Sequence, residues 1–252
     1  MSLHIEKIGQ GQPLVMIHGW GMHSDMWMQA RDLLSQQFEL HLLDLPGMGY
    51  SQSMADYRLS AVAEKIAQDI PNNAYILGWS LGGLIASKIA LITPVKKLIL
   101  VASTPCFVAR EDWQQGMPSD VFESFFAGAM QDYQGTMHKL LALIAMGSGN
   151  ARATSKMLRE ALSLRPAPNQ QALLGALDIL RTADLRADLH RLATPTLLIH
   201  GAHDKLASLS AAEWTAKTLP NATLFTLPSA AHEPFISHPQ IFADKITEFL
   251  LA

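Results

Sequence analysis

Short apolar runs rich in β-branched residues alternate along the chain with longer segments of helical length. Each run is bounded by Gly, Pro, Asp or Asn, as is typical of buried strands. Six such runs begin at Pro13, Phe38, Ala74, Lys97, Thr196 and Ala222. The segments 59–70 and 81–92 suit helices, and residues 3–9 suit an antiparallel edge strand. This alternation predicts an α/β fold with a mostly parallel central sheet flanked by helices.

One long interval contains no convincing strand. Between residues 105 and 191 the pattern instead predicts helices, over 121–129, 134–146, 152–162 and 172–180. A stretch of this length is too long for an ordinary loop. We therefore expect a helical lid at 105–191, inserted into an α/β core formed by 1–104 and 192–252.

Composition narrows the class of protein. Of the 252 residues, 49% are hydrophobic and 16% are charged, which suits one large core and excludes a disordered chain. The formal net charge of -3 argues against a nucleic-acid partner. Cys106 is the single cysteine, so an internal disulfide is excluded. The chain shows neither a secretory signal nor a membrane-spanning run. We expect a cytoplasmic monomer.

A candidate nucleophile lies where a predicted strand turns into a predicted helix. The residues Gly78-Trp79-Ser80-Leu81-Gly82 form the pattern G-x-S-x-G in that context. Such a turn strains the serine backbone and leaves no room for side chains at the glycines. It presents the hydroxyl at a helix N-terminus, where amide groups favour negative charge. The alternative is a glycine-rich turn with an ordinary capping serine.

A serine nucleophile needs a base, and the base needs an orienting acid. His232 follows the strand that begins at Ala222, and Asp204 follows the strand that begins at Thr196. The order Ser, Asp, His is the one expected for α/β hydrolases. His203 and His238 are rivals for the base. Taken alone, Asp204 or His232 would equally suit a loop residue.

The first strong strand ends in His18-Gly19-Trp20-Gly21, which matches the loop that supplies an oxyanion donor. We assign the two donors to the backbone amides of Trp20 and Leu81. His18 is interpreted as structural. The chain has no metal-ligand cluster, phosphate loop or dinucleotide fingerprint, so no cofactor is expected.

Two features of the inserted helices suggest binding surfaces. An apolar run is a candidate cover for Ser80, or the core of the subdomain: Leu140, Leu141, Ala142, Leu143 and Ile144. Residues 133–177 also hold five basic residues against one acidic residue, Glu160: Lys139, Arg152, Lys156, Arg159 and Arg165. The spacing of Arg152, Lys156 and Arg159 places them on one helix face. That face is either simply solvated or a dock for an acidic partner.

Several stretches resemble one family of α/β hydrolases, the pimeloyl-acyl-carrier-protein methyl ester esterases of biotin synthesis. They extend along nearly the whole chain: HGWGM, LLDLPGMGYS, LGWSLGGLIASKIAL, VASTPCF and AAHEPFISHP. The resemblance implies a triad of Ser80, Asp204 and His232. It also implies that Trp20 and Leu81 flank the acyl group.

The same resemblance extends to the lid. It implies that residues 140–144 line the acyl channel. It further implies that basic lid positions receive an acidic acyl carrier protein, and these positions are Lys139, Arg152, Lys156 and Arg159. The chain departs from the family where Gly135 replaces a basic residue and Leu140 replaces an aromatic one.

The residues predict a serine carboxylesterase that works through an acyl-enzyme. The resemblance implies that it hydrolyses the methyl ester of pimeloyl-acyl-carrier protein and releases methanol. Other functions fit the same scaffold, namely a general short-chain carboxylesterase, a thioesterase or a carbon–carbon bond hydrolase. A non-catalytic small-ligand receptor and a lid-mediated protein-binding module are alternatives from other classes.

Overall fold

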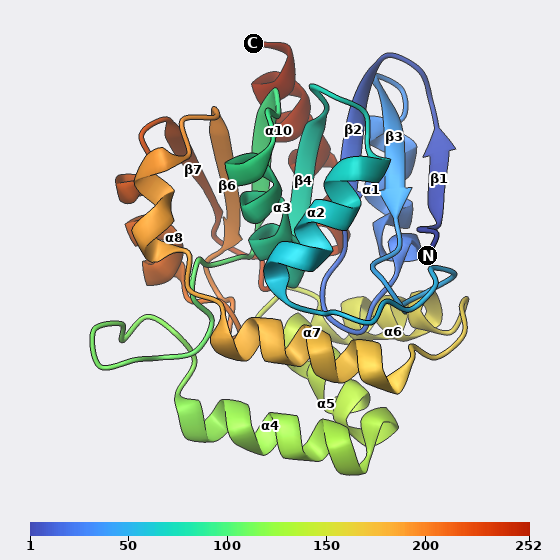
Figure 1. Ribbon diagram of the computed structural model, residues 1–252, viewed down its shortest axis with the longest axis vertical. Helices are drawn as coiled ribbons and strands as arrows, with labels where there is room; N and C mark the ends of the chain where they lie inside the picture. The colour runs from blue at the N-terminus through green and yellow to red at the C-terminus, as the bar shows by residue number, and fades with distance from the viewer.

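A seven-stranded sheet forms the centre of the computed structural model, which describes residues 1–252 (Figure 1). Its strand order is β1-β3-β2-β4-β5-β6-β7. β1 pairs antiparallel with β3, and every other neighbouring pair is parallel. The predicted α/β class and the antiparallel edge strand are therefore confirmed. The strands are β1 (Ile5–Ile8), β2 (Gln12–Ile17), β3 (Phe38–Leu43), β4 (Tyr75–Trp79), β5 (Lys97–Val101), β6 (Thr196–Gly201) and β7 (Ala222–Leu227).

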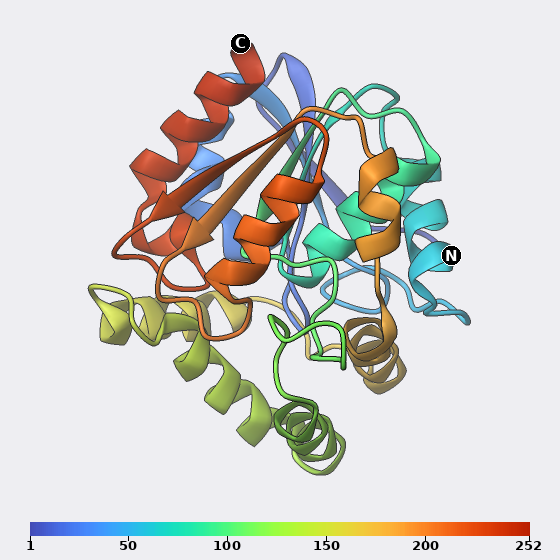
Figure 2. The ribbon, with the colours of Figure 1, turned by 90° about the vertical axis from the view of Figure 1, so that its left-hand side faces the viewer.

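Helices cover both faces of the sheet, as the buried strands require. α1 (Met28–Leu34) packs with α10 (Pro239–Leu251) on one face (Figure 2). α2 (Leu59–Asp69), α3 (Leu81–Ile92) and α8 (Leu209–Thr218) lie on the other. The short elements are η1 (Ser24–Trp27), η2 (Arg186–Arg191) and α9 (Pro234–Ser237). None of the helices has the length and apolar character that crossing a bilayer would require.

Four helices stand between β5 and β6, in the interval predicted to be helical: α4 (Ser119–Gln131), α5 (Tyr133–Ala145), α6 (Ala151–Leu162) and α7 (Gln170–Thr182). They gather below the carboxyl ends of the parallel strands (Figure 1). Buried side chains of the insertion, including Leu141, Leu158 and Leu177, belong to the same apolar cluster as the sheet. The insertion therefore shares one core with the sheet, and we refer to residues 105–191 as the lid.

Candidate active site

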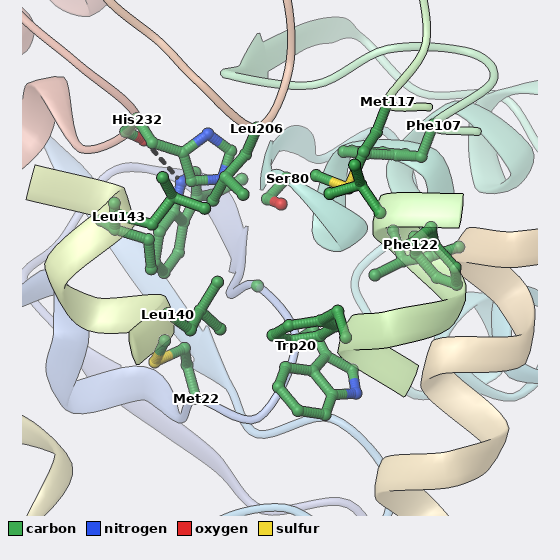
Figure 3. A pocket seen from close by; sticks show the side chains of 16 residues that line it. Trp20, Met22, Ser80, Phe107, Met117, Phe122, Leu140, Leu143, Leu206 and His232 are labelled. Atoms are coloured by element: carbon green, nitrogen blue, oxygen red, sulfur yellow. Dashed lines mark hydrogen bonds between the residues drawn. The ribbon is translucent and has the colours of Figure 1, made fainter. Parts of the chain in front are cut away.

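Ser80 occupies the sharp turn between β4 and α3. Its backbone has φ 55° and ψ -118°, a conformation that costs a non-glycine residue free energy. A Cβ at Gly78 would lie 2.2 Å from the carbonyl oxygen of Gly82, and one at Gly82 would lie 2.2 Å from that of Ile17. The glycines of the motif are thus needed because backbone meets backbone on both sides. Figure 3 shows the Ser80 hydroxyl directed into a cavity.

His232 and Asp204 meet at the same end of the sheet. His232 Nδ1 lies 2.8 Å from Asp204 Oδ2. Asp204 Oδ1 accepts hydrogen bonds from the amides of Leu206 and Ala207, at 2.8 and 3.0 Å. The indole of Trp79 donates to the His232 carbonyl at 2.8 Å. These contacts hold the carboxylate and the imidazole in a fixed relation, with Nδ1 directed at Asp204.

Asp204 is buried yet ionised. Burial raises the pKa of its carboxyl, but the opposing effects of His232, of His200 and of the amide hydrogen bonds leave that pKa below its ordinary value. His200 Nε2 lies 3.5 Å from Asp204 Oδ2 and donates to the carbonyl of Ala207 at 2.8 Å. Burial lowers the pKa of His200, which favours its neutral form. His200 was not among the predicted site residues, although it lies in the strand that leads to Asp204.

The rival histidines lie elsewhere. His238 Nε2 contacts the Ser229 hydroxyl at 2.8 Å, and His203 packs against Gly147 of the lid. Neither forms a hydrogen bond with Asp204, and neither lines the cavity at Ser80. Of the three candidates for the base, only His232 both contacts Asp204 and lines the cavity at Ser80.

Ser80 and His232 line the same cavity, but no hydrogen bond joins the Ser80 hydroxyl to the His232 ring. Rotation about the Cα–Cβ bond of Ser80 is the movement that would turn the hydroxyl towards Nε2. Catalytic hydrogen bonds often tighten only when substrate is bound. That Ser80, His232 and Asp204 act together as a triad therefore stays a prediction.

The loop after β2 brings Trp20 to the cavity. The Trp20 amide donates no hydrogen bond within the protein, and Leu81 is the first residue of α3, where helical amides lack intrahelical partners. The Trp20 indole donates to the carbonyl of Leu173 in α7 at 2.8 Å, which fixes the ring against the lid. Neither amide is used by the backbone, and their role as oxyanion donors stays a prediction.

His18 has a different role in that loop. Its Nδ1 donates to the Gly19 carbonyl at 2.8 Å, and its Nε2 accepts from the Leu45 amide at 2.9 Å. Burial lowers the pKa of His18 to about 4. The ring is neutral and fully used by backbone contacts, in agreement with its structural interpretation.

The cavity at Ser80 has a volume of about 110 Å³ and a wall that is almost entirely apolar. Leu140, Leu143 and Ile144 line it, as expected (Figure 3). The expectation for Leu141 and Ala142 is wrong, because Leu141 lies in the core and Ala142 is exposed. An α-helix has 3.6 residues per turn, so five consecutive residues of α5 cannot all face one cavity.

Most of the remaining wall was missed by the sequence analysis. It comes from three segments of the lid, from the loops after β2 and β6, and from β4: Phe107, Met117, Val121, Phe122, Phe125, Leu180, Met22, Leu206 and Trp79. The spacing of Phe122 and Phe125 on α4 gives a weak signal for a shared face. The other residues are apolar positions that the sequence cannot distinguish from ordinary core.

Four basic residues of the predicted docking face are exposed on α5 and α6: Lys139, Arg152, Lys156 and Arg159. Lys156 lies 3.6 Å from Glu160, and Arg159 donates to the Ser155 hydroxyl at 2.8 Å. We call these four residues the basic face of the lid.

Arg165 is not part of that face. Its side chain is only 6% exposed and pairs with Asp25 and with Asp44, the latter at 2.6 Å. Asp44 also accepts from the amides of Ser24 and Tyr50, at 2.8 and 2.9 Å. The guanidinium therefore joins the lid to two carboxylates beside the Trp20 loop. Its position in a basic stretch of sequence gave no indication of this.

Comparisons with known proteins identify the family of the fold. A family model described as alpha/beta hydrolase fold matches residues 12–239. The chain belongs to the α/β hydrolase family. An esterase from Exiguobacterium antarcticum superposes with a TM-score of 0.89 at 24% identity, covering 99% of this chain and 96% of that one. A bromoperoxidase from Bacillus anthracis gives 0.91 at 20% identity, with 99% and 95% covered. At these identities the likeness concerns the fold.

Curated relatives share more of the sequence. A protein of Nitrosomonas europaea is 42% identical over 96% of both chains, and one of Pectobacterium atrosepticum is 42% identical over 100% of this chain and 99% of its own. Both are named pimeloyl-[acyl-carrier protein] methyl ester esterase. The resemblance to this family of α/β hydrolases and the prediction of an ester hydrolase are confirmed.

Proposed function

We propose that this α/β hydrolase cleaves the methyl ester of a pimeloyl-acyl carrier protein and releases methanol and the free ω-carboxylate. The observation that carries the proposal is that His232, hydrogen-bonded to Asp204, lines the same apolar cavity as Ser80. Support comes from relatives of that name, which match this chain at 42% identity over nearly its whole length.

In the first half of the reaction, His232 takes the proton of the Ser80 hydroxyl while Ser80 Oγ bonds to the ester carbonyl carbon. Asp204 holds the imidazole in the required tautomer and stabilises its protonated form. The amides of Trp20 and Leu81 stabilise the oxyanion. The bond to the methoxy oxygen then breaks, and methanol leaves with the proton from His232.

In the second half, water attacks the acyl-enzyme. His232 takes a proton from the water as its oxygen bonds to the acyl carbon. The bond to Ser80 Oγ breaks, and the serine recovers its proton from the imidazole. The product is a carboxylic acid, which loses its proton to solvent. The apolar side chains of the lid hold the acyl chain and exclude other water molecules.

The basic face of the lid completes the proposal. Its four exposed cations suit an acidic carrier that holds the other end of the acyl chain. The double substitution Lys156→Glu/Arg159→Glu is expected to raise KM for the carrier-bound ester by about tenfold or more, because it reverses two charges at the encounter surface. Turnover of a small methyl ester should not change. An equal loss on both substrates would contradict docking at this face.

The central test compares Ser80→Ala with the native protein on carrier-bound pimeloyl methyl ester and on a p-nitrophenyl ester. We expect kcat to fall by about 10⁵-fold or more, as when a nucleophile is removed from similar triads. Ser87→Ala is a matched control, because Ser87 lies on the same helix and its hydroxyl bonds only the Gly83 carbonyl. Retained turnover in Ser80→Ala would refute the nucleophile. A higher kcat/KM on thioesters or diketones would indicate one of the other hydrolase activities.

A growth test addresses the physiological reaction. The gene should restore biotin-independent growth to a host that lacks its own methyl esterase, and the Ser80→Ala gene should not. Failure of the native gene, with the protein expressed and active on small esters, would leave a general carboxylesterase and contradict the carrier-bound substrate.

A further inference from the structure

The cavity wall is apolar almost throughout. Of its sixteen residues thirteen are hydrophobic, and the only polar side chains are the Ser80 hydroxyl and the His232 ring. Both belong to the reaction, which leaves the acyl chain surrounded by carbon and sulfur. Figure 3 shows this for Phe107, Met117 and Phe122 on one side of Ser80 and for Leu140 and Leu143 on the other.

The charge behind this wall is negative. Asp204 is ionised, and its Oδ2 lies 2.8 Å from His232 Nδ1. The lid cations are directed elsewhere. Arg165 is taken up by Asp25 and Asp44, and the basic face contributes no residue to the cavity. A second carboxylate inside the cavity would therefore meet no cation and one nearby anion.

The cavity approaches the surface at the first turn of α4, where Val121 lines it and is 50% exposed. Asp120 and Glu123 are exposed on either side of Val121. Asp120 lies in the first turn and offsets the partial positive charge of the helix N-terminus, and Glu123 adds a negative charge in the second turn. An anion that enters the cavity at this point therefore receives little electrostatic stabilisation from the protein.

We propose that the cavity accepts an ester only when its acyl chain is uncharged over the depth of the cavity, and that it rejects a carboxylate there. This inference rests on the proposed function, since it assumes that Ser80 hydrolyses esters. Moving an ion out of water into an apolar site without a partner is far more costly than moving a neutral ester. An acyl chain between a methyl ester and a carrier thioester is neutral at both ends and meets the requirement.

The consequence is that the enzyme removes one ester group from a short diester and then stops. Hydrolysis of the first group consumes one water and yields one methanol, one carboxylate and one proton. The half-ester that results would have to bury its new carboxylate to present its second ester to Ser80. The newly formed carboxylate is therefore both the product of the reaction and the group that prevents rebinding.

The test uses the native protein and three sets of substrates: the dimethyl and monomethyl esters of succinate, adipate and sebacate, and uncharged methyl alkanoates of matching length. For succinate we expect kcat/KM of the dimethyl ester, per ester group, to exceed that of the monomethyl ester by about 100-fold or more. The ratio should fall towards one for sebacate, whose far carboxylate reaches solvent. Ratios within about threefold for succinate and adipate would overturn the proposal.

The methyl alkanoates distinguish a failure of the proposed esterase function from a failure of the proposed exclusion of charge. Lack of turnover on every methyl ester, alkanoates included, would count against the proposed function. Turnover of alkanoates, diesters and short half-esters at similar rates would leave the esterase intact and overturn only the exclusion of charge.

A pH series identifies charge as the cause. Both a half-ester and its matched alkanoate react with the same free enzyme, so enzyme ionisations cancel from the ratio of their kcat/KM values. If only the neutral acid binds, the kcat/KM of the half-ester divided by that of the alkanoate rises about tenfold for each unit that the pH falls between about 8 and 6. The reason is that the free carboxyl group of the half-ester titrates near pH 4. A ratio that stays constant with pH would show that the exclusion is steric and would overturn the proposal.

Discussion

The two walls of the cavity are built in different ways. The wall from the sheet places Ser80 and His232 by a strained turn and by buried hydrogen bonds. The wall from the lid offers side chains such as Leu140, Leu143 and Phe122, which contribute shape and apolar area. Catalysis depends on atoms held within a fraction of an ångström. An apolar cover tolerates substitutions of similar volume. Changes in the first wall should therefore cost far more activity than changes in the second.

The two walls are not independent. The amide of His232 donates to the carbonyl of Ile144 in α5 at 3.3 Å, and the amide of Gly149 donates to the carbonyl of Ser229 at 3.2 Å. Arg165 forms a separate connection between the lid and the core, at Asp25 and Asp44. Substitutions at these joints test whether the lid acts only as a cover.

After the loss of the nucleophile in Ser80→Ala, the largest effect is expected at Asp204. In Asp204→Asn the geometry is kept, but the amide favours the wrong imidazole tautomer, so kcat should fall by about 10⁴-fold. Steady-state kinetics on a p-nitrophenyl ester measures it. Asp188→Asn, at a partly exposed carboxylate paired with Arg191, is the control. A fall below tenfold would mean that Asp204 serves only as a cap for the amides of Leu206 and Ala207.

Arg165 should come next. Arg165→Gln leaves the buried Asp44 and the partly buried Asp25 without their cation, and breaking a buried pair costs about 3–5 kcal/mol as an upper bound. Urea denaturation should show a fall in the free energy of unfolding of that order, with Arg165→Lys in between. The exposed Arg152→Gln should change stability by less than about 0.5 kcal/mol. Equal free energies of unfolding for the Arg165 and Arg152 variants would show that the ion pairs of Arg165 with Asp25 and Asp44 do not stabilise the fold.

Glu233, beside His232, gives a pH-dependent effect. Its carboxyl is fully buried, and both oxygens lack hydrogen-bond partners. Burial, with the negative charge of Asp204, raises its pKa from 4.5 to about 8. The folded state therefore holds a proton that the unfolded chain loses above its lower pKa. Its contribution to stability is complete below about pH 4.5, declines as the pH rises to about 8, and is constant above that.

Glu233→Gln removes this titration. Relative to the variant, the native protein should lose on the order of 1 kcal/mol of unfolding free energy per pH unit between about pH 5 and 8. Urea denaturation at several pH values measures the difference, and Glu248→Gln, at an exposed carboxylate, should track the native protein. Parallel pH curves for the native protein and Glu233→Gln would mean that Glu233 is ionised in the folded state.

The difference between the walls also explains what the sequence could predict. Ser80, Asp204 and His232 could be located because each follows a recognisable strand and because glycine is sterically required at Gly78 and Gly82. The lid helices could be placed from their periodicity. Their cavity-facing residues could not, because an apolar side chain on α4 or α5 gives the same pattern whether it meets the core or the cavity.

Contacts between segments that are distant in the sequence could not be predicted for a similar reason. Arg165 lies in a segment with an excess of basic residues. Only the fold brings it to Asp25 and Asp44, which are more than a hundred positions away in the sequence. In the sequence, His200 looks like any other residue of a buried strand. Only the turn after that strand brings it to within 3.5 Å of Asp204. Chain spacing carries information about local elements, whereas these pairings depend on how the elements are packed.

The smallest effect is expected in the lid wall. Leu143→Ala removes part of the apolar surface that holds the acyl chain, so kcat/KM should fall about threefold to tenfold on a long-chain methyl ester, and less on methyl acetate, which does not extend to that surface. Ala142→Ser is the matched control, since Ala142 neighbours Leu143 on α5 but faces solvent. A loss for Leu143→Ala as large on methyl acetate as on the long ester would show that α5 acts through its bond from Ile144 to His232. The lid would then help to position the imidazole, and the division between a catalytic wall and a covering wall would fail.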